Sequence, residues 1–244
     1  MRTFLHFRLY GPMASWGEPA ANELRPSAVH PSRSAVLGLL GAALGIQRDD
    51  ATALHRLDDA LGLAILVERA GVPMDDYHTT QVARDPWFKQ APRATRADEL
   101  VPHRRDLDTT LSRRGYRCDG VYGVLAWSRS GAEPLEPIRQ ALLRPRHRLC
   151  LGRLACPPAL PLKPTLLEAA DAASALAQAP SVPDDFPLLR PEGPQRLFWS
   201  AEDSLAVGQP AESLTPRRDR ALDRGRWLFA ERLEAQARWQ AGAP

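Results

Sequence analysis

Residues 25–50, RPSAVHPSRSAVLGLLGAALGIQRDD, predict a basic, proline-containing loop that leads into an apolar helix. Gly38, Gly41 and Gly45 recur at intervals of three and four residues within the apolar part. Because residues at this spacing share one face of an α-helix, that face carries almost no side chains. We therefore expect a sheet or the backbone of a ligand to approach the helix closely along the glycines.

The start of this helix is a candidate anion site. Ser32, Arg33 and Ser34 occupy its first turn, where a serine caps free backbone N–H groups and where anions bind readily. Capping alone explains the serines, but an arginine in the first turn opposes the helix dipole. A bound phosphate or another acid would remove this conflict. The sequence leaves open whether the helix is only capped or also binds phosphate.

The segments around this helix predict an α+β fold. Residues 11–30 form a long loop, and loops of this length are commonly functional. Apolar periodicity predicts further elements: a strand at 3–10, a helix at 51–61, strands at 63–68 and 121–127, and a helix at 134–143. This order matches a split βαβ half of a ferredoxin-like fold. The proline-rich residues 144–164 then supply or flank a fourth strand.

The chain is expected to contain one main domain with two additions. Residues 1–164 form the ferredoxin-like, RNA-recognition-motif-like domain. Residues 71–117 are polar, charged and weakly periodic, which predicts a protruding hairpin or thumb insertion. Residues 165–244 are expected to form a small C-terminal subdomain. Its predicted elements are a helix at 165–178 and strands at 197–200 and 227–233.

The distribution of charge favours a polyanionic partner. The 32 basic and 29 acidic residues give a net charge of only +3, which permits a nucleic-acid partner without requiring one. From Arg139 to Arg153, however, five arginines and one histidine occur without an acid. Arg144, Arg146 and Arg148 alternate, so an extended chain would point them to one side. A solvated face or a guarded edge strand is the ordinary explanation, but arginine forks also match phosphate oxygens.

Other residue types exclude several classes of protein. Cys118, Cys150 and Cys156 are too few for a disulfide framework or a zinc site, so we expect no metal and no cofactor. The longest apolar run, residues 35–46, is too short to span a bilayer. The first ten residues do not form a signal peptide. We expect a cytoplasmic protein without a membrane partner.

The sequence DYHTT at residues 76–80 permits a catalytic hypothesis. Tyr77 and His78 could act as acid and base in metal-independent RNA cleavage, in which a 2′-hydroxyl attacks the adjacent phosphate. No lysine or second histidine lies nearby in the sequence to stabilise the charged transition state. Hydrogen bonding to RNA or to a loop backbone is the simpler role, so we expect no catalytic residues.

Four ordered stretches resemble the CasD family of type I-E CRISPR Cascade subunits. They are GPMASWG at 11–17, residues 25–50, DYHT at 76–79 and LRPRHRLCLGRLACPP at 143–158. That family belongs to the RAMP superfamily of RNA-binding, ferredoxin-like proteins. The resemblance implies a non-catalytic subunit that holds the 5′ handle of the CRISPR RNA, caps one end of the backbone filament and supports antiviral defence. Related RAMP proteins that process repeat RNA leave a metal-independent endoribonuclease as the alternative.

The resemblance also implies partners and site residues. The partners would be CRISPR RNA, a CasC-like backbone subunit contacted through the thumb, a CasA-like large subunit and, through the complex, target DNA. Trp16 could be either a core residue or a stacking platform for a base. The expected RNA-binding residues are Met13, Ser15, Trp16, Arg25, Ser32, Arg33, Ser34, Tyr77, His78, Arg104, Arg105, Arg144, Arg146, Arg148 and Arg153.

Overall fold

The computed structural model describes residues 1–20, 23–83, 95, 97, 107–180, 186–191, 193–223, 226 and 228–239. The elements that build the fold are β1 (Arg2–Tyr10), β2 (Met13–Ala14), β3 (Leu24–Arg25), α1 (Arg33–Leu44), α2 (Ala51–Ala60), β4 (Leu61–Arg69), β5 (Val72–Ala83), β6 (Leu107–Cys118), β7 (Val121–Ser128), α5 (Leu135–Leu143), β8 (Thr165–Ala169), α6 (Ala172–Ala177), β9 (Arg196–Ser200), α7 (Ser204–Val207), β10 (Ser213–Asp223) and β11 (Leu228–Arg238).

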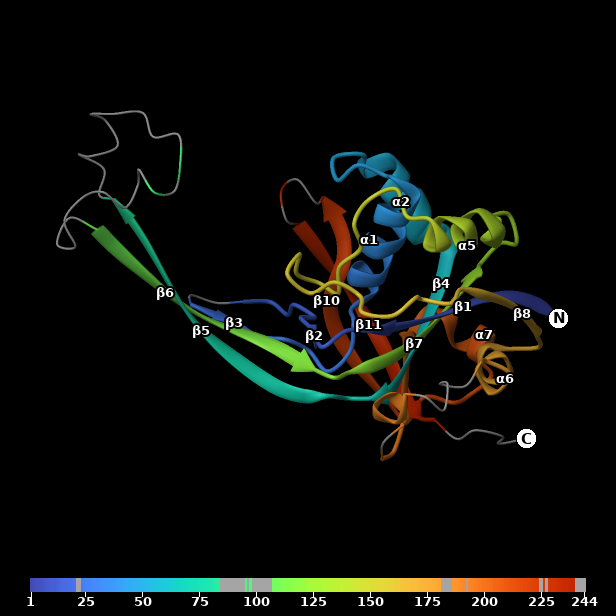
Figure 1. The fold of residues 1–244 in the computed structure, drawn as a ribbon. Coiled ribbons are helices and arrows are strands. Elements are labelled where there is room, and N and C mark those ends of the chain that lie inside the picture. Colours follow the sequence, from blue (N-terminus) through green and yellow to red (C-terminus); the bar gives the residue numbers. More distant parts are fainter. Residues whose placement is uncertain are drawn as a thin grey trace.

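A seven-stranded sheet forms the body of the molecule, in the order β10-β11-β9-β4-β7-β1-β8 (Figure 1). Every neighbouring pair in it is antiparallel. The strands expected at 3–10, 63–68 and 121–127 correspond to β1, β4 and β7, and the helices expected at 51–61 and 134–143 correspond to α2 and α5. The α+β class is therefore confirmed.

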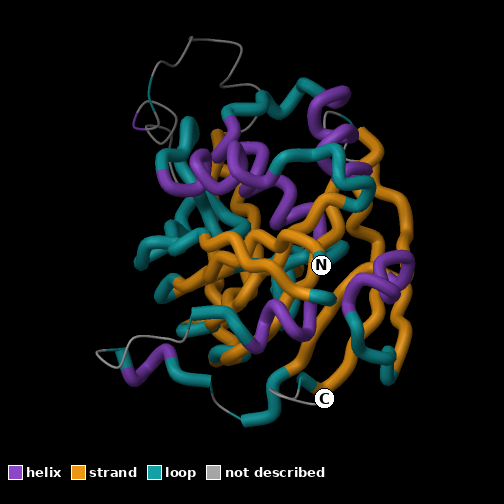
Figure 2. The backbone as a smooth tube through the Cα atoms, turned by 90° about the vertical axis from the view of Figure 1, so that its right-hand side faces the viewer, coloured by secondary structure: helices purple, strands orange, loops and turns teal. Residues whose placement is uncertain are grey.

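The sheet has an apolar layer on each face because its central strands are apolar on both sides. Leu5, Phe7 and Leu9 of β1 join a core cluster with α1, α2 and α5. Phe4 of the same strand points the other way and packs with Trp127 in a second cluster that includes α6 residues. Figure 2 shows helical segments above and below the strands. Strand alternation thus explains how one strand supports both layers.

The C-terminal third differs from expectation in two ways. Residues 165–178, expected to be helical, begin with strand β8, and helix α6 occupies only Ala172–Ala177. Pairing of β8 with β1 overrides the local helical preference of this segment. The strands expected at 197–200 and 227–233 correspond to β9 and β11. Together with β10, which the sequence did not predict, they extend the same sheet as β1 and β4.

The polar insertion forms a long two-stranded ribbon. Strands β5 and β6 pair antiparallel from Val72 and Cys118 to Ala83 and Leu107. The short strands β2 and β3 also pair with β6, and this second sheet projects away from the body (Figure 1). Buried Tyr116 joins the base of the ribbon to the core on the helical side of the main sheet. The second sheet brings β3, and with it Arg25, beside the body.

Candidate nucleic-acid interface

A groove of about 1240 Å³ runs along helix α1, and we call it the α1 groove. Gly38 and Gly41 line it, but Gly41 is buried and a Cβ on it would lie 3.3 Å from Leu54, so part of the glycine face predicted from the sequence packs against α2. Gly45 plays a different part, because it ends the helix in a left-handed conformation with φ of +82°. The remaining walls come from residues 15–20, Arg25, residues 147–153 and the hairpin of β10 and β11.

Positive charge dominates the α1 groove. Its acidic lining residues are Glu18 and Asp219, and Asp219 is already paired with Arg232 at 2.7 Å. His147 also lines the groove. The five arginines of the lining are Arg25, Arg48, Arg148, Arg153 and Arg218. Such a groove attracts a polyanion, and its glycine-lined side leaves room for a chain to lie against helix α1.

Residues 151–153 are fitted closely against the loop that follows β1. Gly152 has φ of +87°, and a Cβ at this position would lie 1.8 Å from the carbonyl oxygen of Ser15. The N–H of Ser15 donates to the carbonyl of Leu151 at 2.9 Å. Arg153 lies over the Tyr116 ring at 4.6 Å and donates to the carbonyl of Arg25 at 3.2 Å. These contacts fix one rim of the groove to β3 and to the ribbon.

The start of α1 binds an acid, but the acid belongs to the protein. Ser32 caps the helix by accepting the N–H of Ala35 at 3.1 Å. The N–H of Arg33 donates to Oδ2 of Asp219, in β10, at 2.9 Å. The conflict between Arg33 and the helix dipole, noted from the sequence, is therefore relieved by an internal carboxylate. The first turn is a capped helix start docked to the hairpin.

Arg33 is not an accessible RNA contact, contrary to expectation. Its side chain turns inward and is only 3% exposed. Nε is 2.6 Å from Oδ1 of Asp58, and Nη2 donates to the carbonyl of Leu61 at 2.7 Å. Burial lowers the pKa of Arg33, and the charge of Asp58 opposes that shift. Arg33 thus joins α1 to α2 and β4 in the interior.

A buried charge network holds the hairpin against α1. Arg232 pairs with Asp219 at 2.7 Å and with Glu234 at 2.6 Å. Glu234 also contacts Arg217 at 3.0 Å and His30 at 3.2 Å. Burial raises the pKa of Glu234, but His30 and the two arginines outweigh it and lower that pKa to about 2. The carboxylate therefore stays charged, and the network ties the third wall of the groove to the loop before α1.

One family model matches most of this chain, from β1 into β11. The family model described as CRISPR-associated protein (Cas_Cas5) matches residues 4–233. This chain belongs to the Cas5 family. It is 32% identical over 221 residues to the CRISPR system Cascade subunit CasD of Escherichia coli K12, covering 87% of this chain and 92% of that protein. The resemblance to CasD found in the sequence is thereby confirmed.

Solved structures support the same relationship. A chain of a CRISPR RNA-guided surveillance complex superposes with a TM-score of 0.68 and 27% identity, covering 99% of this chain and 91% of that chain. A structure described as a Cas protein superposes with a TM-score of 0.63 and 24% identity, covering 99% of this chain and all of that one. The second likeness concerns the fold alone. Both superpositions cover 99% of this chain, so they include the main sheet together with its C-terminal strands.

The predicted residues of this Cas5 chain fall into separate places. Trp16 is 2% exposed and packs edge-on against Tyr122 at 5.4 Å, so it is a core residue and not a stacking platform. Met13 lies in β2, beside Cys118 of the ribbon. Arg104 and Arg105 lie outside the described residues. Six predicted residues line the α1 groove: Ser15, Arg25, Ser32, Ser34, Arg148 and Arg153.

The alternating arginines do not form a straight strip. The chain bends at Arg144, Arg146 and His147, so an extended strand with all three arginines on one side is not formed. The N–H groups of residues 146 and 147 donate to carbonyls of α1 at 3.0 and 3.1 Å, which carries the segment across the end of that helix. Arg144, Arg146 and Arg148 are exposed, but only Arg148 lines the groove.

Tyr77 and His78 lie on the ribbon and do not line the α1 groove. Tyr77 is 60% exposed. Nδ1 of His78 lies 2.9 Å from Oδ2 of Asp76 on the same strand. Cross-strand register places Arg114 opposite Asp76 and beside Arg25 of β3. The ribbon beside Arg25 therefore carries both a basic and an acidic residue, Arg114 and Asp76.

The sequence did not identify the hairpin residues of the groove, Arg218, Leu228 and Phe229. A usable signal was present, because Arg217 with Asp219 and Arg232 with Glu234 alternate in charge at a spacing of two. That pattern is typical of charge pairing across two strands. It was obscured by the surrounding polar residues and by Pro216, which disfavours a strand. The hairpin was therefore expected only as an uncertain strand.

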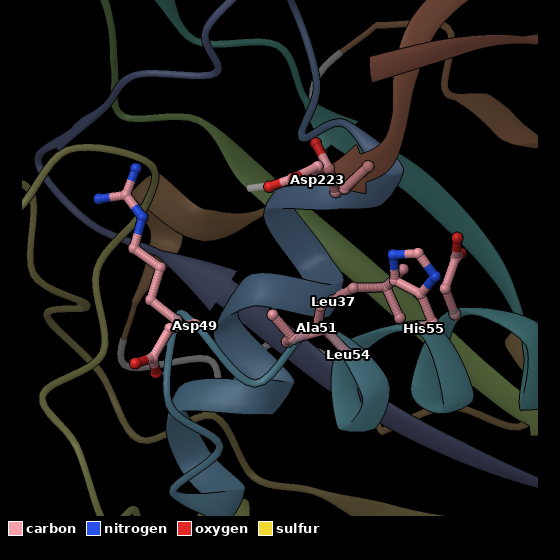
Figure 3. Close-up of a pocket in the computed structure, with 10 residues that line it drawn as sticks. Leu37, Asp49, Ala51, Leu54, His55 and Asp223 are labelled. Carbon is pink, nitrogen blue, oxygen red and sulfur yellow. The ribbon is translucent and has the colours of Figure 1, made fainter. Parts of the chain in front are cut away.

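A smaller cavity of about 130 Å³ lies between α1, α2 and the hairpin (Figure 3). Leu37 and Leu54 form its apolar side, and Asp49 and Asp223 lie at its polar margin. His55 contacts the carbonyl of Leu222 through Nε2 at 2.8 Å. Ligand pockets usually measure roughly 300–1,000 Å³, so this cavity fits a packing seam better than a nucleotide site.

Within the described residues, no helix is long and apolar enough to cross a membrane.

Proposed function

We propose that this chain is a non-catalytic RNA-binding subunit of a CRISPR Cascade surveillance complex in the cytoplasm. It holds the 5′ handle of the CRISPR RNA, caps one end of the backbone filament and so supports antiviral defence. The observation that carries the proposal is the α1 groove, whose lining includes five arginines. The family match and the names of the two relatives, a Cascade subunit and a chain of an RNA-guided surveillance complex, support the same role.

We further assign the core to the ferredoxin-like class. The elements β1, α1, β4, β7, α5 and β8 follow one another as βαββαβ, and their strands lie in the order β4-β7-β1-β8. This arrangement is that of ferredoxin-like and RNA-recognition-motif proteins. In the chain, the ribbon of β5 and β6 is an insertion between β4 and β7, the second and third of these strands. The hairpin extends the sheet beyond β9.

The chemistry of the groove suits a single RNA strand. Arginine guanidinium groups bind phosphate oxygens through paired, charge-assisted hydrogen bonds. Gly38 lines the groove without a side chain, so the sugar-phosphate backbone could lie beside α1 at that position. Basic grooves that follow the backbone are the common basis of single-strand binding. The affinity should accordingly fall as salt concentration rises.

The endoribonuclease alternative needs a general base close to the bound backbone and a cation that stabilises the transition state. His78 lies on the ribbon and contacts Asp76. His147 lines the groove and is 3.4 Å from the side-chain amide of Gln47. Both histidines are exposed or nearly so, and among the described residues neither forms a hydrogen bond or ion pair with a lysine or with another histidine. This arrangement favours binding without cleavage.

Purified protein incubated with single-stranded repeat RNA in EDTA should bind the RNA and leave it intact. Binding is measured by electrophoretic mobility shift, and cleavage on a denaturing gel of the same reactions. His78→Ala and His147→Ala variants should behave like the original protein in the cleavage assay. A specific cut that disappears in either variant would establish the nuclease alternative instead.

The ribbon is proposed as the thumb that contacts a CasC-like backbone subunit. It projects from the body and exposes apolar side chains, with Val72 64% and Tyr77 60% exposed. A CasA-like large subunit is proposed to seat beside the bound handle. Target DNA would then be reached only through the assembled complex.

Replacing residues 80–110 with Asn-Gly should preserve the fold and abolish assembly. Thr79 and Leu111 are paired across the ribbon, so a two-residue turn can join them. Buried Tyr116 and the hydrogen bond from Ser15 to the carbonyl of Gly115 remain in place. Melting temperature should stay nearly unchanged, while co-purification with a CasC-like subunit and guide RNA should be lost. Normal incorporation into the complex would exclude the ribbon as the contact.

A further inference from the structure

The hairpin of β10 and β11 is one wall of the α1 groove. Arg218 of β10 and Leu228 and Phe229 of β11 line the groove across from the glycines of α1. Nε of Arg218 donates to the carbonyl of Phe229 at 3.1 Å, so the side chain of Arg218 reaches from β10 across to β11. A cation and an aromatic side chain thus occupy neighbouring positions on this wall.

A β-bulge separates the structural and the exposed residues of β10. The register shifts between Arg217 and Arg220, where two residues of β10, Arg218 and Asp219, face one residue of β11. Bulges of this kind redirect side chains and are common beside functional sites. Asp219 is buried and caps α1, whereas Arg218 is exposed at the groove. Among the described residues, no carboxylate forms an ion pair with Arg218.

The hairpin is held rigidly enough to serve as a binding wall. Arg220 pairs with Asp59 at 3.1 Å, and the carbonyl of Leu222 contacts His55 of α2. Asp219 docks to the first turn of α1 at 2.9 Å. Residues 219, 220 and 222 therefore link the hairpin to two helices at the bulge and just after it. Side chains on such a wall lose little conformational entropy when a ligand binds.

We propose that Phe229 stacks on a base of the bound RNA while Arg218 contacts the phosphate next to it. This inference rests on the proposed RNA-binding function. Phe229 is an aromatic residue among those that line the groove. The RNA strand would pass between the basic rim at Arg148 and Arg153 and the hairpin, with α1 beneath it. Sequence-tolerant stacking on an aromatic ring beside an arginine is a common way to hold unpaired bases.

The two side chains make separable contributions. In Phe229→Leu the apolar side chain is kept and the ring is lost, so affinity for RNA should fall about ten- to a hundredfold with an unchanged salt dependence. Phe229→Tyr keeps the ring and should bind like the original protein. In Arg218→Gln one phosphate contact is lost, so affinity should fall and the slope of log affinity against log salt should decrease by about 0.7. Arg238→Gln, an exposed arginine at the other end of the hairpin, is the matched control.

The measurement is fluorescence anisotropy of labelled single-stranded repeat RNA, repeated with 2-aminopurine at successive positions of the 5′ handle. One position should show reduced 2-aminopurine emission with the original protein and with Phe229→Tyr, but not with Phe229→Leu. Thermal melts check that each variant is folded. If the original protein binds no repeat RNA, the proposed function itself fails. If it binds and both Phe229→Leu and Arg218→Gln bind equally well, or lose only complex assembly, this inference is overturned and the hairpin contacts a protein subunit or nothing.

Discussion

Replacing Arg33 with alanine should lower the free energy of unfolding by about 3–5 kcal/mol, the usual cost of removing one partner of a buried ion pair. The guanidinium lies 2.6 Å from Asp58, and both side chains are nearly inaccessible to solvent. Without Arg33, the ion pair that remains to Asp58 among the described residues is the longer one with Arg220, at 3.6 Å, and Arg129 interacts with it electrostatically. Urea unfolding followed by circular dichroism measures the loss.

Two variants make this prediction specific. Arg56→Ala removes an exposed arginine from α2 and should change stability by less than about 0.5 kcal/mol. Arg33→Met combined with Asp58→Leu replaces the pair by apolar side chains and should recover much of the loss. If Arg33→Ala is as stable as the original protein but binds RNA weakly, the guanidinium faces RNA after all.

Arg33 shows how much of its environment the local sequence can predict. The sequence indicated correctly that a cation in the first turn of α1 requires a nearby acid. The acid is Asp219, which lies 186 residues further along the chain. The guanidinium itself is neutralised by Asp58. No local pattern could choose between these carboxylates and a phosphate, because the choice depends on which strand the fold brings to the helix.

Elements with strong periodicity were predictable, and elements defined by their partners were not. Strands β4 and β7 are apolar runs buried on both faces, so the sequence located them within two residues. Residues 165–169 became a strand because β1 offers them an unpaired edge. The close approach of other residues to the glycines of α1 followed from glycine spacing alone, because Leu54 lies against Gly41 and Arg146 against Gly45. The hairpin opposite α1 did not, since its stability comes from charge pairs between strands.

The same distinction applies to Trp16. The loop that carries it lies close to another backbone, because a Cβ on Gly11 would lie 2.8 Å from the carbonyl oxygen of Pro157. The tryptophan ring itself packs on Tyr122 within the core. A loop position and a large aromatic ring are compatible with either role. Only the placement of Tyr122 in β7 decides between them.

Replacing Arg148 and Arg153 together with glutamine should weaken binding of repeat RNA by about 3–6 kcal/mol, if each guanidinium makes one charge-assisted contact of about 1.5–3 kcal/mol with a phosphate. Both residues line the α1 groove. The slope of log affinity against log salt should decrease by about 1.4, since each phosphate contact to a single strand contributes about 0.7. Fluorescence anisotropy at several salt concentrations gives both quantities.

The matched control is Arg144→Gln with Arg146→Gln, which removes the same charge from the same segment outside the groove. Glutamine keeps part of the Arg146 stem, whose Cδ would lie 2.6 Å from a Cβ on Gly45, so the packing at the end of α1 is largely retained. Arg153→Lys keeps the charge but not the planar fork over Tyr116, and should restore only part of the affinity. Equal losses in both double variants would mean that RNA responds to net charge alone. A loss confined to Arg148 and Arg153 would follow from a strand that lies in the groove, because only there do position and charge act together.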